Sequence, residues 1–126
     1  EASVSKYVQV VQKRYTAEQM VALHGACDVY LSLSRGEGFD MPAQDSKLAG
    51  NLMVYTPSGG PQDFASSWDI KVLMEHTILR HDFYDDWEPD ARYGDYHVHD
   101  AALAMRQAAH RVRDGICRFC LGRMLN

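Results

Sequence analysis

The sequence predicts an α/β fold: a partial Rossmann-like domain with a parallel sheet of about four strands, flanking helices and a long C-terminal helix. Three observations lead to this prediction. Short apolar runs rich in β-branched residues alternate with stretches of helical spacing over the first 65 residues or so. Glycine-containing turns follow two of these runs, at positions 36–38 and 59–60. The last quarter of the chain repeats apolar residues at steps of three and four, which is typical of an amphipathic helix.

Composition limits the classes of function. The chain has 126 residues, of which 46% are hydrophobic and 24% charged, and we interpret residues 1–126 as one domain with its own core. Its formal net charge of −4 argues against binding to nucleic acid, which requires a basic face. No apolar run reaches the roughly 18 residues of a transmembrane helix. Three cysteines, an odd number, do not indicate a disulfide framework, so we expect a reducing, cytoplasmic compartment.

The N-terminal third predicts a strand and then a helix. Residues 7–11 form a β-branched run and are expected to be a strand. Thr16 and Gln19 have the spacing of a capping box, which predicts a helix over residues 17–26. Its apolar face is expected to hold Met20, Leu23 and Cys27, with the thiol buried.

The middle of the chain predicts two more strands that alternate with helices. A strand is expected over residues 28–34 and a helix over residues 41–48, with Pro42 in its first turn and Gly50 just beyond its end. A buried strand should follow at residues 52–55, and residues 61–65 should open another helix. In such sheets ligands bind beyond the carboxyl ends of the strands.

The C-terminal half gives weaker signals until its last helix. Residues 70–79 could supply another strand, and residues 80–96 are expected to form an ordered loop anchored by Phe83, Tyr84 and Trp87. A long helix should begin near Asp100. Its predicted apolar stripe is Ala102, Met105, Ala109, Val112, Ile116 and Phe119, while Arg106, Arg111, Arg113 and Arg118 should form a solvated face.

The turn Gly36-Glu37-Gly38 is the strongest candidate for chemistry. It lies between a predicted strand and a predicted helix, whose N-terminal N–H groups and dipole suit a phosphate. The carboxylates Glu37 and Asp45 suit hydroxyl groups, because an ionised carboxylate only accepts hydrogen bonds. A site for both phosphate and hydroxyl groups predicts a nucleoside-diphosphate sugar as the ligand.

The run over residues 27–64 also resembles the donor-binding, C-terminal half of family 4 retaining glycosyltransferases, which have the two-domain GT-B fold. Glu37, Gly38 and Phe39 match the opening of the family's signature, and Gly59-Gly60 matches a later turn. Asp40 stands where the pattern usually has glycine, and Asp45 where it has a second glutamate. The close resemblance covers residues 16–64.

The resemblance implies a role for each matching residue. Glu37 would contact the transferred hexose as the catalytic residue, and the backbone N–H groups of Gly38 and Phe39 would bind the diphosphate near Asp40. Asp45 would hold the ribose hydroxyls. It implies neither a cofactor nor a metal, and the sparse pairs Cys117/Cys120 and His97/His99 are not expected to bind one.

Several of these assignments have structural alternatives. Glu37 could cap the next helix or pair with Arg35, and Gly59-Gly60 could only shape a turn. Asp45 could lie at the solvated edge of its helix. The carboxylate of Asp40 could point away from the site, which would leave the site intact, or cap its own helix and weaken phosphate binding.

The family also uses an upstream Arg–Lys pair and an N-terminal acceptor domain, and neither is recognisable here. We therefore do not expect residues 1–126, a truncated form of the C-terminal domain, to transfer sugar alone. Three interpretations stay open: part of a retaining glycosyltransferase that works with a separate acceptor domain, a non-catalytic nucleotide-sugar-binding module, or a degenerate scaffold domain. A homodimer through an exposed edge strand fits all three.

Overall fold

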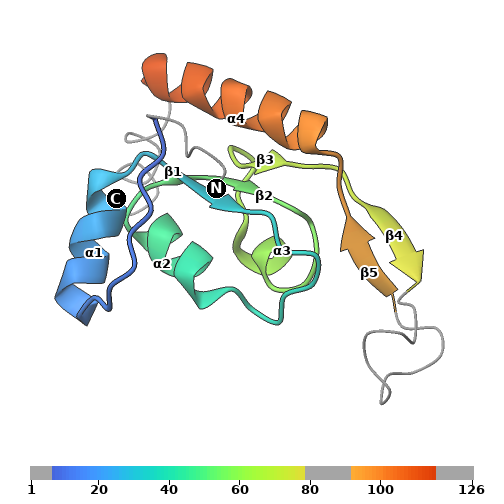
Figure 1. Ribbon diagram of the computed structural model, residues 1–126. Coiled ribbons are helices and arrows are strands. Elements are labelled where there is room, and N and C mark those ends of the chain that lie inside the picture. The colour runs from blue at the N-terminus through green and yellow to red at the C-terminus, as the bar shows by residue number, and fades with distance from the viewer. Residues whose placement is uncertain (1–6, 79–91, 116–126) are drawn as a thin grey trace.

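The computed structural model describes residues 7–78 and 92–115, and these residues form an α/β fold (Figure 1). In chain order the elements are α1 (Ala17–Ala26), β1 (Val29–Ser32), α2 (Met41–Leu48), β2 (Leu52–Tyr55), α3 (Pro61–Phe64), β3 (Ile70–Lys71), β4 (Glu75–Ile78), β5 (Arg92–Asp95) and α4 (Val98–Arg113). The alternation of strands with helices that the sequence predicts is confirmed.

A parallel sheet of β1, β2 and β3, in that order, forms the centre of the fold. Val29 pairs with Leu52, and Val54 pairs with Ile70. Helix α4 lies on one face of this sheet, and α2 and α3 lie on the other (Figure 1). The fold is consistent with a partial Rossmann-like domain, with three parallel strands in the described chain instead of about four.

The strand expected over residues 7–11 is the one that does not form. These residues carry no regular structure, and Tyr7 and Val10 are 84% and 64% exposed. A β-branched run becomes a strand only when a neighbouring strand pairs with its backbone. In the described part of the chain β1 pairs with β2 alone, so local propensity at residues 7–11 was not enough.

Two apolar clusters lie on the two faces of the sheet. Under α4, side chains of β2, of β3 and of the residue after β3 pack against small residues of the helix: Leu52, Val54, Ile70, Val72, Ala101, Ala104 and Ala108. On the opposite face Met53 and Tyr55 of β2 pack against Ala43 of α2. Strand β2 is buried on both faces, which explains its uninterrupted apolar sequence.

The buried stripe of α4 differs by one position from the predicted one over most of the helix, whereas Val112 packs against the core as predicted. The structure buries Ala101, Ala104 and Ala108, whereas Met105 is 49% exposed and Ala109 is exposed. The spacing of apolar residues predicted that the helix face with the larger side chains would be buried. Helix α4 instead packs on the sheet through its alanines. Ile116, Phe119, Arg118 and the pair Cys117/Cys120 lie outside the described residues.

Helix α1 begins as predicted but buries a different face. Thr16 and Gln19 form the capping box, since each side chain accepts a hydrogen bond from the backbone N–H of the other residue. The buried residue of the helix is His24, whereas Leu23 is 42% exposed and the Cys27 thiol is exposed. The buried apolar face and buried thiol expected from the sequence were therefore wrong. Helix α1 packs mainly on α2, and its contact with the sheet is made by the His24 ring against Tyr30.

The strand expected over residues 70–79 is two strands in two sheets. Strand β3 ends at Lys71, and β4 then pairs antiparallel with β5 to make a separate two-stranded sheet. This sheet extends beyond the end of the parallel sheet at which the loop from β1 to α2 lies (Figure 1). Residues 79–91, which include the proposed anchors Phe83, Tyr84 and Trp87, lie outside the described residues.

A buried carboxylate joins three elements at the start of β3. Asp69 accepts hydrogen bonds from the N–H groups of Met53 and Ser66 at 2.8 and 2.7 Å, and from the Ser66 hydroxyl at 2.9 Å. The ammonium group of Lys47 lies 2.8 Å away, and the Asp69 side chain has no exposed surface. This set of partners connects α2 and β2 to the turn before β3.

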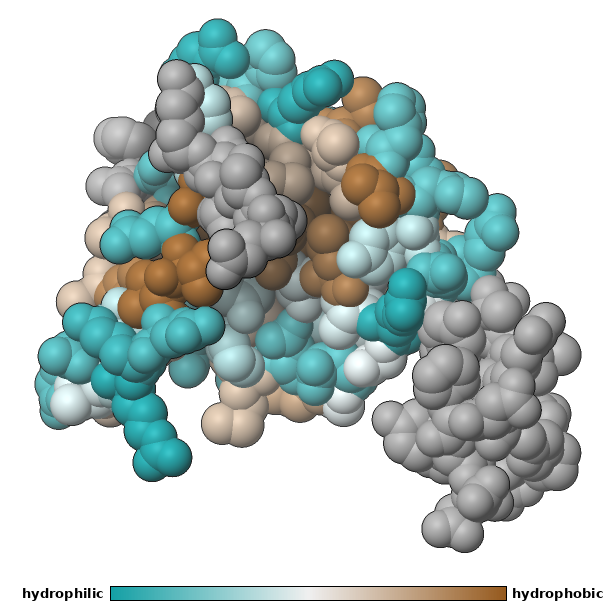
Figure 2. All heavy atoms as spheres, in the orientation of Figure 1, coloured by the Kyte–Doolittle hydropathy of each residue, from teal (hydrophilic) through white to brown (hydrophobic). Residues whose placement is uncertain are grey.

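The outer surface of the described chain is mixed in character. The face in Figure 2 carries apolar patches, drawn brown, among hydrophilic side chains. Among residues 7–78 and 92–115, none of the helices has the length and apolarity that crossing a membrane would require.

Candidate functional site

Two loops meet at the carboxyl ends of β1 and β2. The Glu37 loop, residues 34–40, connects β1 to α2, and the glycine loop, residues 56–60, connects β2 to α3. The hydroxyl of Thr56 donates to the carbonyl of Ser34, and the N–H of Gly60 donates to the carbonyl of Gly38 at 3.0 Å. The sequence places the candidate site at this edge, and the structure brings its two glycine-containing turns together there.

The glycine loop approaches the Glu37 loop too closely to admit a side chain. A Cβ atom at Gly59 would lie 1.6 Å from the carbonyl oxygen of Glu37, and Gly59 has a φ of +70°. A Cβ atom at Gly60 would lie 2.3 Å from the Cα atom of Phe39. Glycine is therefore needed at both positions for close backbone packing. This agrees with the interpretation that Gly59-Gly60 shapes a turn.

The motif residues Glu37, Gly38 and Phe39 lie at the surface of this packed loop. Glu37 is exposed, and its Oε1 atom accepts a hydrogen bond from the N–H of Gly38 at 3.1 Å. Phe39 is 43% exposed, and its ring centroid lies 5.5 Å from that of Phe64 at the end of α3. A fixed backbone thus presents an exposed carboxylate and a half-exposed aromatic ring to solvent.

Asp40 has an unusual conformation with a clear cause. Its φ of 63° makes it the one non-glycine residue with positive φ in the described chain. Glycine adopts this left-handed region freely, and aspartate is among the few other residues that tolerate it. The aspartate at the position where the family pattern usually has glycine is therefore compatible with the backbone that such a turn requires.

The carboxylate of Asp40 points inward and caps α2. One of its oxygens accepts a hydrogen bond from the N–H of Ala43 at 3.2 Å, and the other accepts one from the Ser32 hydroxyl. Only 9% of the Asp40 residue surface is exposed. Pro42 has no N–H to offer, so a protein carboxylate occupies the helix N-terminus at which the sequence predicts a diphosphate.

Asp45 lies on α2 and is exposed. Met41 and Leu48, which share its helix face, are 68% and 75% exposed, so the apolar face expected there is not buried. The helix instead turns Ala43 and Ser46 inward. Asp45 therefore sits on the solvated side of the helix, in agreement with the structural alternative for this residue.

Sequence reasoning did not identify Tyr30, a β1 residue close to the same carboxylates. Burial is the main cause that raises the pKa of the Tyr30 phenol, and the negative charges of Asp40 and then Glu37 raise it further. Its ring centroid also lies 5.8 Å from that of His24. Tyr30 thus remains a neutral hydroxyl beside the candidate site at physiological pH.

Sequence reasoning also missed the contact between the Glu37 loop and strand β5. The N–H of Gly94 donates to the carbonyl of Arg35 at 2.9 Å, and the Arg35 Nε atom lies 3.3 Å from a carboxylate oxygen of Asp95. These residues are about 60 positions apart, and no local pattern connects them. The structure thus gives Arg35 an ion pair with Asp95.

One buried polar atom at this edge is unpaired. In the part of the chain that the structure describes, the Ser34 hydroxyl is buried without a hydrogen-bond partner, as is the Nε2 atom of His24. Groups of three or more His, Cys, Asp or Glu side chains with the arrangement of a metal site do not occur among residues 7–78 and 92–115.

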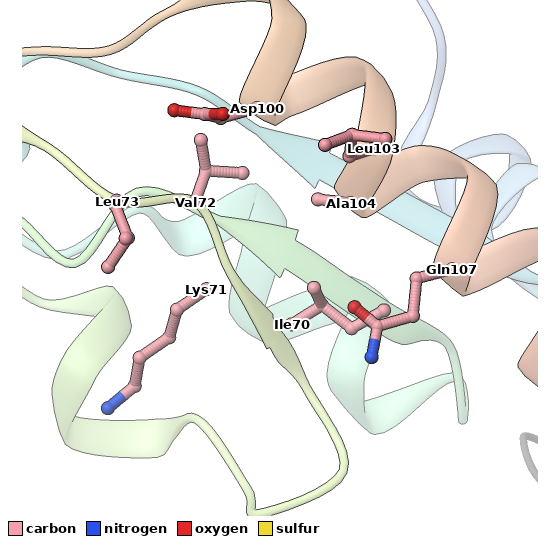
Figure 3. A pocket seen from close by; sticks show the side chains of 8 residues that line it. All are labelled: Ile70, Lys71, Val72, Leu73, Asp100, Leu103, Ala104 and Gln107. Carbon is pink, nitrogen blue, oxygen red and sulfur yellow. The ribbon is translucent and has the colours of Figure 1, made fainter.

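A separate groove of about 240 Å³ lies between β3 and α4 (Figure 3). Ile70 and Val72 line it from the strand side, and Asp100, Leu103 and Gln107 line it from the helix. It includes no residue of the Glu37 loop or the glycine loop, so it is not part of the candidate site.

Comparison with protein-family models, with curated proteins and with solved structures finds no match to this chain. The described residues form an α/β fold, with two loops joined by hydrogen bonds at the carboxyl end of its parallel sheet. A functional assignment therefore depends on the residues of these loops and on the motif that they carry.

Proposed function

We propose that this chain binds a nucleoside-diphosphate sugar, as the donor side of a retaining hexosyl transfer to an acceptor hydroxyl. The transfer itself requires a separate acceptor domain, because a single domain provides one wall of a two-domain cleft. The proposal keeps the roles given above: Glu37 for the sugar, Gly38 and Phe39 for the diphosphate beside Asp40, and Asp45 for the ribose.

The observation that carries this proposal is the packing of Gly59 against the carbonyl of Glu37. It holds the backbone of the Glu37 loop in place at the carboxyl end of the sheet, where ligands of such folds bind. The Glu37 side chain is exposed from this fixed backbone. A carboxylate held in this way can accept hydrogen bonds from sugar hydroxyls with little loss of loop entropy.

The left-handed backbone at Asp40 supports the same proposal. The family pattern usually has glycine at this position, and the φ of 63° supplies a physical reason for glycine there. Electrostatic stabilisation of the leaving diphosphate would be the main contribution of the protein to the reaction.

A second candidate is a module that binds the nucleotide or nucleotide sugar without turnover. The capping of α2 by the Asp40 carboxylate favours the absence of turnover, since its negative charge opposes the charge that would develop on a leaving diphosphate at this helix N-terminus. Both candidates predict nucleotide binding, whereas a scaffold domain does not. A cytoplasmic location and a homodimer belong to the proposal as well, and the exposed thiol of Cys27 supports a reducing compartment.

The test is a thermal-shift titration of the chain with UDP, GDP, ADP and their hexose conjugates. A ligand that binds the native state adds stability by mass action, about 2.7 kcal/mol at a concentration roughly 100 times its Kd. We expect a shift with one of the three nucleotide families. No shift with any nucleotide or conjugate would overturn both binding candidates and leave the scaffold interpretation.

A pair of variants identifies the role of Glu37. Glu37→Ala should abolish the extra shift given by the sugar conjugate over its parent nucleotide, with little change in the Tm of the free protein. Asp114→Ala removes another exposed carboxylate, at the end of α4, and should leave both quantities as they are in the wild type. A large fall in the Tm of free Glu37→Ala protein would show that Glu37 is structural.

A further inference from the structure

We propose that Arg35 is the cation that binds the diphosphate of the donor, and that Asp95 occupies its guanidinium group until the donor arrives. This inference rests on the proposed function and deepens it by naming the phosphate-binding side chain. It also gives the β4–β5 sheet a part in the site, because Asp95 is the last residue of β5.

Several backbone donors near the start of α2 already have partners within the protein. The N–H of Ala43 donates to the Asp40 carboxylate, Pro42 has no N–H, and the N–H of Gly38 donates to Glu37. Two backbone N–H groups near the start of α2 are thus used within the protein, and a third position has none. With fewer backbone donors available, a diphosphate at this edge gains most from a side-chain cation.

The charges of the two loops also point to Arg35. Residues 34–40 and 56–60 contain two acidic residues, Glu37 and Asp40, and a single basic residue, Arg35. Guanidinium groups suit phosphate because their planar set of donors can bind two oxygens at once. Of the residues in the two loops, Arg35 is the one that can offset the acidic charge against an incoming anion.

The backbone around Arg35 is fixed by hydrogen bonds, whereas its side chain is exposed. The carbonyl groups of Ser34, Arg35 and Gly38 accept hydrogen bonds from Thr56, Gly94 and Gly60, so the backbone is fixed on both sides of the turn. The side chains of Arg35 and Asp95 are 63% and 44% exposed. An exposed pair of this kind contributes little free energy, so a phosphate can replace the Asp95 carboxylate at small cost.

The test measures nucleotide affinity in three variants, and the two site variants should change it in opposite directions. Arg35→Gln should weaken binding of the nucleoside diphosphate that binds the wild type by about tenfold or more, because it removes a charged donor. Asp95→Asn should tighten binding by about two- to fivefold, because it removes the competing charge. Arg106→Gln, an exposed arginine on α4, makes the same charge change elsewhere and should leave affinity unchanged.

The outcomes separate this inference from the proposed function. Wild-type binding with unchanged affinity in Arg35→Gln would overturn the role of Arg35 but keep the proposed function. If Asp95→Asn also binds the nucleotide more weakly, Asp95 does not give way to the phosphate and is instead a positioning residue for Arg35. A wild type that binds none of the nucleotides or conjugates would overturn both proposals. Weaker salt dependence of binding in Arg35→Gln than in the wild type would support the inference further.

Discussion

The Cα atom of Gly59 packs on the carbonyl of Glu37 so closely that a Cβ atom there would stand 1.6 Å from the oxygen. Gly59→Ala must therefore displace one of the two loops, and it also places a side chain at a φ of +70°. We expect a loss of about 2–4 kcal/mol in the free energy of unfolding, measured by urea denaturation.

Gly36→Ala is the matched control for that prediction. Gly36 lies in the same loop, and an added Cβ atom would have nothing within 4 Å. Its free energy of unfolding should stay within about 0.5 kcal/mol of the wild type. Equal losses in the two variants would show that the loop responds to any added side chain, and not to the contact with Glu37.

Asp40 should show opposite effects on stability and on ligand binding. Asp40→Gly keeps the left-handed backbone but removes the cap of α2, which should cost about 1 kcal/mol in stability. Under the proposed function it should also raise affinity for a nucleoside diphosphate, because the N–H of Ala43 becomes available and a negative charge is lost. Chemical denaturation and a nucleotide titration of the same sample measure both effects.

Asp40→Asn separates the cap from the charge. Asparagine tolerates positive φ and caps helices as well as aspartate does, so stability should stay close to that of the wild type. Affinity for the nucleotide should rise, but less than in Asp40→Gly. If neither variant binds more tightly, the carboxylate does not compete with the ligand.

Removal of the Asp69 carboxylate should be the most damaging of these substitutions. Asp69→Ala leaves the Lys47 ammonium, whose side chain is only 17% exposed, without its carboxylate. It also removes the acceptor of the Met53 and Ser66 N–H groups. Loss of one partner of a buried pair costs about 3–5 kcal/mol in the free energy of unfolding. Asp63→Ala, at an exposed position in α3, should change it by no more than about 0.5 kcal/mol.

The packing face of α4 can be tested with two substitutions one residue apart. Ala104→Met overpacks the contact with the sheet and should cost about 1–3 kcal/mol in stability. Met105→Ala truncates a side chain that is 49% exposed and should have a much smaller effect. Thermal and urea denaturation of both variants measure the difference. A larger loss of stability in Met105→Ala than in Ala104→Met would support the buried stripe predicted from the sequence.

Alkaline pH should destabilise the fold through two tyrosines. Burial is the main cause that raises the pKa values of Tyr30 and Tyr55 above the ordinary 10.0, with further contributions from nearby carboxylates. A raised pKa means that folding favours the neutral phenol, so this stability is present below pH 10.0 and is lost as the pH rises through the folded-state pKa values.

Urea denaturation from about pH 8 to about pH 11 measures this loss. Tyr30→Phe and Tyr55→Phe should each flatten the decline at the alkaline end. A profile that is equally steep in all three proteins would assign the alkaline sensitivity to other groups.

The sequence predicted the features that local chemistry determines. The capping box at Thr16 and Gln19 and the positive φ of Gly50 after α2 follow from residues within a few positions of each other. The alternation of β1, α2 and β2 follows from hydrophobic spacing, and it placed the candidate site at the carboxyl end of the sheet.

Features that depend on distant partners were not predictable from one sequence. Within the described chain, the strand expected at residues 7–11 has no neighbouring strand to pair with. Helix α4 lies so close to the sheet that alanines, and not Met105, fill the contact. The contacts of Arg35 with Gly94 and Asp95 and the bonds to Asp69 join residues far apart in the chain. None of these pairings leaves a local sequence pattern.

The capped N-terminus of α2 makes Asp40 a tethered competitor of any anion that approaches this helix. A covalently attached group acts at an effective concentration of the order of millimolar or above, so a free phosphate at lower concentration displaces it only with the help of other contacts. The hexose at Glu37 and the ribose at Asp45 would supply such contacts, whereas inorganic phosphate has none. Under the proposed function, the Asp40 carboxylate would therefore favour binding of a whole nucleotide sugar over binding of its fragments.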